Sequence, residues 1–156
     1  MITRANKRLW ILRRLKILGA QQEALVNVYV KQIRCILEFG APVWQGSVTV
    51  AEKYDIERVQ KIAARIILGR QYNSYQDALL TLNLENLDDR RNRLCLKFAL
   101  KAEVHPKFKH WFKKNTKIYN TRGKRTKYKQ TYASHSRYAK TPLSYLTKLL
   151  NLYYRK

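Results

Sequence analysis

Carboxylate side chains, which supply most acid–base and divalent-metal chemistry, are scarce in this sequence. The 156 residues include only 10 Asp and Glu, and Asp88 and Asp89 form an adjacent pair. Successive helical positions diverge by about 100°, so these two carboxylates could not share one metal ion. Acidic side chains in the first turn of a helix instead complement the helix dipole, and we interpret the pair in that way.

Nucleophile and metal-ligand patterns are equally sparse. His105 and His110 have a spacing found in zinc fingers, but Cys35 and Cys95 lie far apart in the chain. A structural zinc site normally takes its cysteines as a close pair. The five glycines are isolated, so there is no glycine-rich phosphate loop either. We therefore expect no catalytic residues, no metal site and no cofactor.

Basic side chains recur at helical spacing in the second half of the chain, at Arg90, Arg93, Lys97 and Lys101. Residues three and four apart lie on one face of a helix. Such a face presents a line of cations that can follow a phosphate backbone. The alternative is an ordinary solvated outer face of a helix.

A second group of cations follows without any acidic residue among them. Its members are Lys113, Lys114, Lys117, Arg122, Lys124, Arg125, Lys127 and Lys129. Tyrosines are interleaved with these cations, namely Tyr119, Tyr128, Tyr132 and Tyr138. Phosphate pairing combined with base stacking is typical of single-strand binding. We expect Trp10, Trp44 and Trp111 to be core or interface anchors, because large apolar residues flank them.

The overall charge agrees with a polyanionic partner. There are 33 Lys and Arg, which gives a formal net charge of +23. All 10 acidic residues precede residue 104, and the last third of the chain has none. Nucleic acid is the commonest partner that would neutralise such a surface. Attachment of the basic tail to anionic membranes is an alternative.

The apolar pattern predicts an all-α fold, an irregular bundle of about five helices that positions these cations. We expect helices over about 4–18, 21–39, 49–69, 74–82 and 86–104, from apolar spacing, cap residues and glycine stops. Periodicity disappears between Lys113 and Lys140, which predicts a flexible basic segment. Thr141 and Pro142 then open a short amphipathic helix. The expected domains are 1–112, 113–140 and 141–156.

Cysteine usage and hydropathy indicate the compartment. Cys35 and Cys95 lie among apolar neighbours and are expected to be buried, reduced thiols. The longest uncharged stretch is too short and too rich in glycine and proline to cross a membrane. We expect a nuclear or cytoplasmic protein that is not secreted.

Segments along nearly the whole chain, in the same order, resemble the region that follows the polymerase domain in non-LTR retrotransposon reverse transcriptases of the jockey and CR1-like type. These segments are Ala5–Trp10, Leu12–Lys16, Val28–Arg34, Leu37–Phe39, Pro42–Trp44, Asp55–Lys61, Ile66–Gly69, Leu94–Ala99, His105–Phe108, Pro142–Thr147 and Leu149–Asn151. The basic segment from Lys113 to Lys140 matches more loosely.

The resemblance implies a thumb-like, post-polymerase helical region that helps to hold template RNA or DNA. It does not imply polymerase activity, because the Tyr-Ala-Asp-Asp or Phe-Ala-Asp-Asp motif of the catalytic palm is absent from this sequence. We therefore expect a non-catalytic nucleic-acid-binding region. The alternative is a protein-interaction module that docks on a polymerase body or self-associates.

Overall fold

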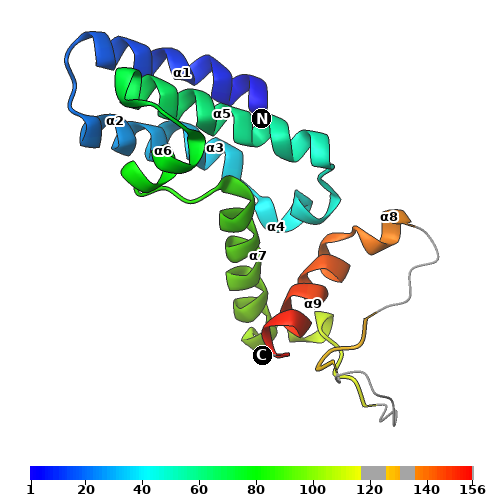
Figure 1. Ribbon diagram of the computed structural model, residues 1–156. Coiled ribbons are helices and arrows are strands. Elements are labelled where there is room, and N and C mark those ends of the chain that lie inside the picture. The colour runs from blue at the N-terminus through cyan, green and yellow to red at the C-terminus, as the bar shows by residue number, and fades with distance from the viewer. Residues whose placement is uncertain (117–125, 131–135, 156) are drawn as a thin grey trace. The chain divides into compact units, whose positions relative to one another are not determined.

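The computed structural model describes residues 1–116, 126–130 and 136–155, and the regular structure in these ranges is helical (Figure 1). The prediction of an all-α fold is confirmed. The elements are α1 (Ile2–Ile17), α2 (Gln22–Val28), α3 (Cys35–Glu38), α4 (Ala41–Trp44), α5 (Val50–Leu68), α6 (Tyr75–Thr81), α7 (Leu87–Val104), α8 (Ser136–Ala139) and α9 (Pro142–Tyr153). A π-helical turn, η1 (Tyr29–Arg34), joins α2 to α3, and 3₁₀ turns lie at η2 (Gln45–Ser47), η3 (Gly69–Gln71) and η4 (Lys109–Trp111).

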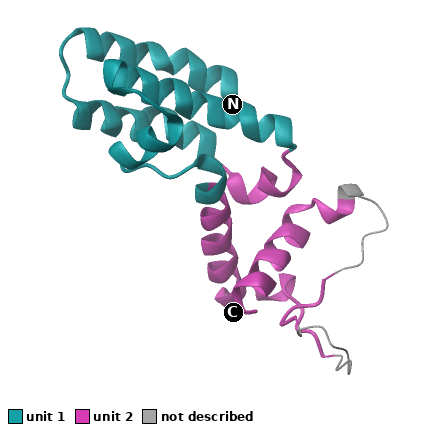
Figure 2. Cartoon of the chain, viewed as in Figure 1, with its two compact units in different colours: residues 1–39, 49–90 teal, residues 40–48, 91–156 magenta. Residues whose placement is uncertain are grey.

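The chain forms two compact units, coloured separately in Figure 2. Unit 1 comprises residues 1–39 and 49–90, and unit 2 comprises residues 40–48 and 91–156. Helix α7 runs through both units, so the boundary expected at residue 112 lies inside unit 2.

Local signals determine where the helices of unit 1 begin and end. Thr49 and Glu52 form the predicted capping box of α5, in which each side chain bonds the other residue's backbone N–H. Ser74 caps α6 through the N–H of Asp77. The predicted stops at Gly19 and Gly40 are confirmed, because both adopt positive φ angles, +80° and +66°, that favour glycine.

Unit 1 is a layered helical bundle in which α1 packs along α5 and against the α2–α3 run, with α6 against α5. Its buried apolar residues include Leu9, Leu12, Leu25, Tyr29, Ile33, Leu37, Ile56, Val59 and Ile67. The antiparallel pairing of α1 with the α2–α3 run is visible in Figure 1. Leu18, the last residue of the helix expected over 4–18, is 76% exposed. It lies beyond the last turn of α1, where its side chain no longer follows the helical stripe.

The π-helical turn aligns the buried stripe of the second helical run. Leu25, Tyr29, Ile33 and Leu37 recur every four residues, and all four are buried. In a regular α-helix each four-residue step drifts by about 40° around the axis. The wider η1 turn removes part of that drift, so all four side chains face the core.

A hydrogen-bonded polar network lies within the core of unit 1. Gln60 is fully buried and accepts a hydrogen bond from the Tyr29 hydroxyl at 2.5 Å. Its amide nitrogen donates to the Tyr75 hydroxyl and to the Glu85 carbonyl, both at 2.9 Å. Because buried polar groups are costly unless bonded, this arrangement fixes α5 against its neighbours. Burial also raises the pKa of the Tyr29 hydroxyl well above its ordinary value.

Unit 2 is built from α4, the C-terminal part of α7 and α9. Its buried core consists of Ala41, Cys95, Ala99, Ala102, Phe112, Tyr128, Leu146 and Leu150. The predicted terminal amphipathic helix is confirmed as α9, which buries Leu146 and Leu150. Gly46 lies so close to α9 that an added Cβ would come within 2.7 Å of the Tyr145 Cβ.

Arg91 is a fully buried charged residue on the inner face of α7. Its Nε donates to the Gln45 Oε1 at 2.8 Å, and its guanidinium lies 5.6 Å from the centroid of the Trp44 ring. Arg91 therefore joins α7 to the Ala41–Ser47 segment rather than facing solvent. Trp44 confirms the prediction of a core anchor, whereas Trp10 is 58% exposed.

Candidate nucleic-acid interface

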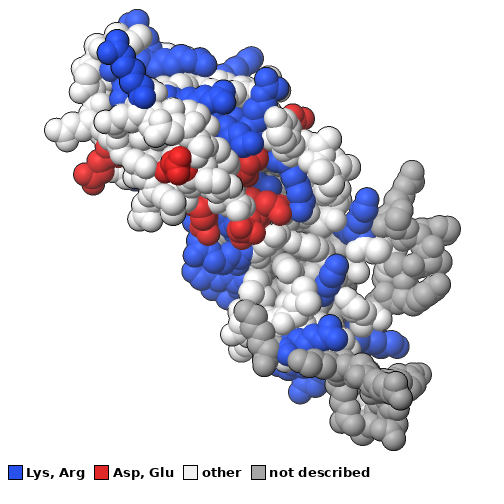
Figure 3. All heavy atoms as spheres, viewed as in Figure 1, with Lys and Arg blue, Asp and Glu red and all other residues white. Residues whose placement is uncertain are grey.

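The two units differ sharply in charge. Unit 2 contains 19 of the 33 Lys and Arg of the sequence, but only one of its 10 acidic residues, Glu103. On the face drawn in Figure 3, the acidic side chains gather over unit 1. The electrostatic attraction for a polyanion is therefore concentrated in unit 2.

Three of the four cations predicted on one helix are exposed on α7, namely Arg93, Lys97 and Lys101. They recur every four residues and so share one face of the helix. That face lies away from Cys95 and Ala99, which are fully buried. These three residues form a shorter array of cations than the four-residue array that the sequence predicts.

Arg90 does not belong to this array. Its Nε donates to Glu38, and its Nη1 lies 3.0 Å from the Glu85 carboxylate. The guanidinium thus neutralises two carboxylates of unit 1. The expectation that Arg90 contributes to a phosphate-binding face is corrected accordingly, because its charge is balanced by Glu38 and Glu85.

Part of the predicted flexible segment is packed in an ordered conformation. Lys114 and Tyr128 form an antiparallel bridge, in which the N–H of Asn115 donates to the Lys127 carbonyl and the N–H of Lys129 to the Lys113 carbonyl. Side chains alternate in extended backbone, so Lys113 and Lys129 lie opposite each other on the side away from Tyr128. The bridge thereby pairs two cations.

Tyr128 is a core residue, which corrects its assignment as a base-stacking tyrosine. Its side chain is only 3% exposed and packs on Phe112 with ring centroids 5.8 Å apart. The Asn151 side chain of α9 bonds both the N–H and the carbonyl of Tyr128, at 2.8 and 2.9 Å. A nucleobase could reach this ring only if the core of unit 2 opened.

The Glu103 carboxylate is the centre of a hydrogen-bonded cluster of side chains. It accepts hydrogen bonds from Lys127 Nζ and from the Tyr154 hydroxyl, both at 2.8 Å, and from the Tyr128 hydroxyl. The Lys127 ammonium also lies 3.4 Å from the centroid of the Tyr154 ring. Burial opposes ionisation of Glu103, but these hydrogen bonds outweigh it and lower the pKa of the carboxyl. Lys127 therefore serves mainly to hold unit 2 together.

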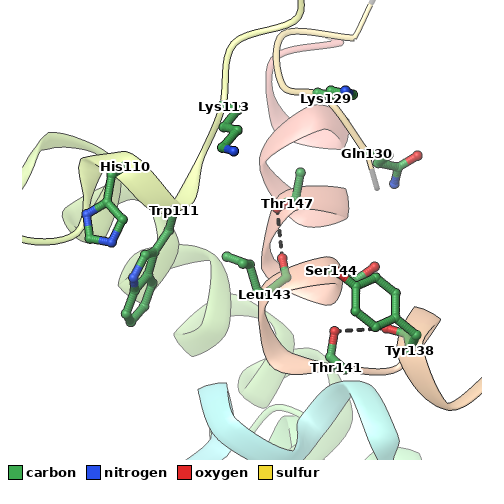
Figure 4. A pocket seen from close by; sticks show the side chains of 10 residues that line it. All are labelled: His110, Trp111, Lys113, Lys129, Gln130, Tyr138, Thr141, Leu143, Ser144 and Thr147. Carbon is green, nitrogen blue, oxygen red and sulfur yellow. Dashed lines mark hydrogen bonds between the residues drawn. The ribbon is translucent and has the colours of Figure 1, made fainter. Parts of the chain in front are cut away.

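A polar groove lies over the first turns of α9 (Figure 4). It has a volume of about 440 Å³ and is lined by His110, Trp111, Lys113, Lys129, Gln130, Tyr138, Thr141, Leu143, Ser144 and Thr147. Figure 4 shows α9 as its floor, with His110 and Trp111 on one side and Gln130 and Tyr138 on the other. The first turn of α9 carries no acidic residue that would repel an anion.

The groove therefore unites two predicted cations, Lys113 and Lys129, with aromatic and hydroxyl side chains. Lys114, also predicted, is exposed on the adjacent strand-like segment. The remaining predicted residues lie outside the described part of the chain, namely Lys117, Tyr119, Arg122, Lys124, Arg125 and Tyr132.

Sequence reasoning missed Trp111 as a candidate site residue. Trp111 is 37% exposed, and it lies in the sequence between Lys109 and Lys113. This alternation of cations with an aromatic residue is the pattern that indicated binding further along the chain. Trp111 was instead expected to be a core or interface anchor because Phe108 and Phe112 flank it.

The two cysteines differ in their burial. Cys95 is buried, and burial raises the pKa of its thiol to about 11. Cys35 is exposed, contrary to expectation, because the buried stripe of its helix passes through Ile33 and Leu37. Within the described residues, no three His, Cys, Asp or Glu side chains converge to hold a metal ion. No helix among them is long and apolar enough to span a membrane.

Comparisons of the chain with protein-family models, with curated proteins and with solved structures found no match.

Proposed function

We propose that this chain is a non-catalytic nucleic-acid-binding region that binds RNA or DNA mainly through unit 2. The observation that carries the proposal is the charge of unit 2. Its sequence contains 19 Lys and Arg but only one acidic residue, Glu103, which is already bonded to Lys127. Phosphates would neutralise the exposed cations, and the release of condensed counterions would drive binding.

The exposed side chains of Arg93, Lys97 and Lys101 supply a row of charge along one side of α7. Lys113 and Lys129 supply a second group at the polar groove. Contacts to phosphate carry no sequence information by themselves, so the binding we propose has little sequence specificity.

The resemblance to the post-polymerase region of non-LTR retrotransposon reverse transcriptases suggests a context for this binding. In that context the chain would help to hold template RNA or DNA while a separate catalytic palm performs synthesis. The proposal assigns the chain no catalytic residue, metal or cofactor of its own.

The experiment is a titration of the full chain with labelled single-stranded RNA, single-stranded DNA and duplex DNA over a salt series. Each phosphate contact should steepen the log–log dependence of affinity on salt by about 0.7 to 0.9. K97Q combined with K101Q should weaken binding and flatten this slope, whereas K31Q on the π-helical turn of unit 1 should change little. Absence of binding at low salt, or affinity that is insensitive to salt, would overturn the proposal.

A second candidate function is a protein-interaction module, and the exposed apolar side chains of α1 favour it. Trp10 is 58% exposed, Ile17 is 77% exposed and the adjoining Leu18 is 76% exposed. These residues could dock on a polymerase body or drive self-association. Light scattering over a concentration series tests self-association: oligomers that are lost in W10D combined with I17D would support it, and a monomer at all concentrations would exclude it.

A further inference from the structure

Trp111 lines two neighbouring hollows of unit 2. One is the polar groove of Figure 4. The other is an apolar hollow of about 610 Å³, lined by Gly40, Pro42, Val43, Phe98, Trp111, Thr141, Pro142, Leu143 and Leu146. Trp111, Thr141 and Leu143 belong to both linings, so the two hollows adjoin each other at these three residues.

The two hollows have complementary chemistry. The groove carries Lys113 and Lys129, which the antiparallel bridge holds opposite each other, and it carries no acidic side chain. The hollow beyond Trp111 is almost wholly apolar. An unpaired nucleotide has the same division, because its phosphate is charged whereas the faces of its base are apolar and prefer to stack.

We propose that Trp111 is a stacking platform for an unpaired base, so that the nucleic acid bound by unit 2 is engaged there as a single strand. This inference rests on the proposed function and assigns a site to it. The strand's phosphates would lie in the groove between Lys113 and Lys129. One base would turn past Thr141 into the apolar hollow and stack on the indole.

The position of the indole suits this role. Phe108 packs beside Trp111 with ring centroids 4.8 Å apart, which supports the ring from the protein side. The indole nevertheless remains 37% exposed, and Phe98 and Leu143 in the same hollow are 37% and 41% exposed. A base entering the hollow would cover apolar surface that water contacts in the free protein.

Charge decides between a strand and an apolar protein segment as the occupant. The open apolar surface adjoins the paired cations of the groove and lies in the unit that carries almost no acid. A purely apolar partner would gain nothing from those cations, whereas a strand would use both hollows at once.

The test compares two polyanions of which only one carries bases, namely an oligothymidylate of about 10 nucleotides and inorganic polyphosphate with about the same number of phosphates. W111A should weaken binding of the oligothymidylate by about 5- to 150-fold and leave polyphosphate binding unchanged. K113Q combined with K129Q should weaken binding of both. Binding to duplex DNA, whose bases are already stacked, should not respond to W111A.

Tryptophan fluorescence gives a readout that a merely structural role would not change. Stacking should quench the emission of the wild-type protein on addition of oligothymidylate. W111F, which keeps an aromatic ring at this position, should abolish that quenching while retaining most of the affinity. W10F removes an exposed indole of unit 1 and should leave the quenching intact.

The outcomes separate this inference from the proposed function. Suppose that the wild type binds both polyanions and that W111A does not change the affinity for oligothymidylate. That result would overturn the stacking site but not the proposed phosphate binding. The stacking site would also be overturned if W111A and W111F each lost affinity for both polyanions to the same extent. Failure of the wild type to bind either polyanion would instead reject the proposed function.

Discussion

Lys127 Nζ lies 2.8 Å from the Oε1 of Glu103, and this ion pair joins the end of α7 to a segment that the sequence predicts to be flexible. Tyr128 and Tyr154 bond the same carboxylate. Because Glu103 is the one acidic residue in the sequence of unit 2, its removal should affect folding and binding in opposite directions.

E103Q should lower the free energy of unfolding by about 1 kcal/mol, since it removes a charge-assisted bond that is partly exposed to solvent. It should strengthen nucleic-acid binding, because the net charge becomes more positive. Thermal melting and a nucleic-acid titration measure the two effects. E23Q, on an exposed position of α2, is the control. A more stable variant, or one that binds less tightly, would contradict the assigned role of Glu103.

The stability of the chain should decline in acid partly through Glu103. The pKa of this carboxyl is lowered in the folded protein, so its contribution to stability is complete above the ordinary glutamate value of about 4.3. The contribution is lost as the pH falls through the lowered value. Urea unfolding should therefore show a difference between wild type and E103Q at neutral pH that disappears in strong acid. A difference that persists in acid strong enough to protonate Glu103 in the folded protein would contradict this linkage.

Arg90 and Lys97 form a matched pair of cations on one helix with different expected roles. R90Q should destabilise the protein by about 1–2 kcal/mol, because it leaves Glu38 and Glu85 without their shared partner. K97Q should leave the melting temperature unchanged and weaken nucleic-acid binding. The log–log dependence of affinity on salt should become shallower by the contribution of about one phosphate contact. Denaturant unfolding and salt-series titration distinguish the two. The assignment is wrong if the effects are reversed.

G46A should destabilise unit 2 by about 1–3 kcal/mol, because the added methyl group would overlap Tyr145 and force α9 to shift. The circular-dichroism melting curve measures this effect. S47A changes the neighbouring exposed residue and should cost less, since it removes only a bond to the Trp44 carbonyl. Equal melting temperatures for G46A and wild type would show that α9 adjusts freely.

Helix positions were predictable because their signals are local. The capping box of Thr49 and Glu52, the Ser74 cap and the positive-φ glycines act within one turn of the helix they begin or end. Three or four residues of sequence therefore contain all the information that is needed.

The roles of individual cations and tyrosines were not predictable in this way. Arg90 is neutralised by Glu38, which lies 52 positions away, and Tyr128 is held by Asn151, 23 positions away. Arg90 also binds Glu85, five positions away, but no local pattern indicates the contact with Glu38 or that of Tyr128 with Asn151. Arg91 likewise occupies a position in the apolar stripe of α7, and its contacts with Gln45 and Trp44, far away in the sequence, account for its burial.

The π-helical turn at Tyr29–Arg34 also marks a position where the chain could lose one residue without disturbing the packing of the residues that follow. The buried residues of this run are spaced four apart, whereas a buried stripe on a regular α-helix alternates steps of three and four residues. Deletion of an exposed residue such as Lys31 would restore that alternating spacing. Leu37 and Glu38 would continue to face their present neighbours. The same deletion within α5 would rotate every following residue by about 100°. The turn is thus a site where an extra residue could be gained or lost without changing which side chains the bundle encloses.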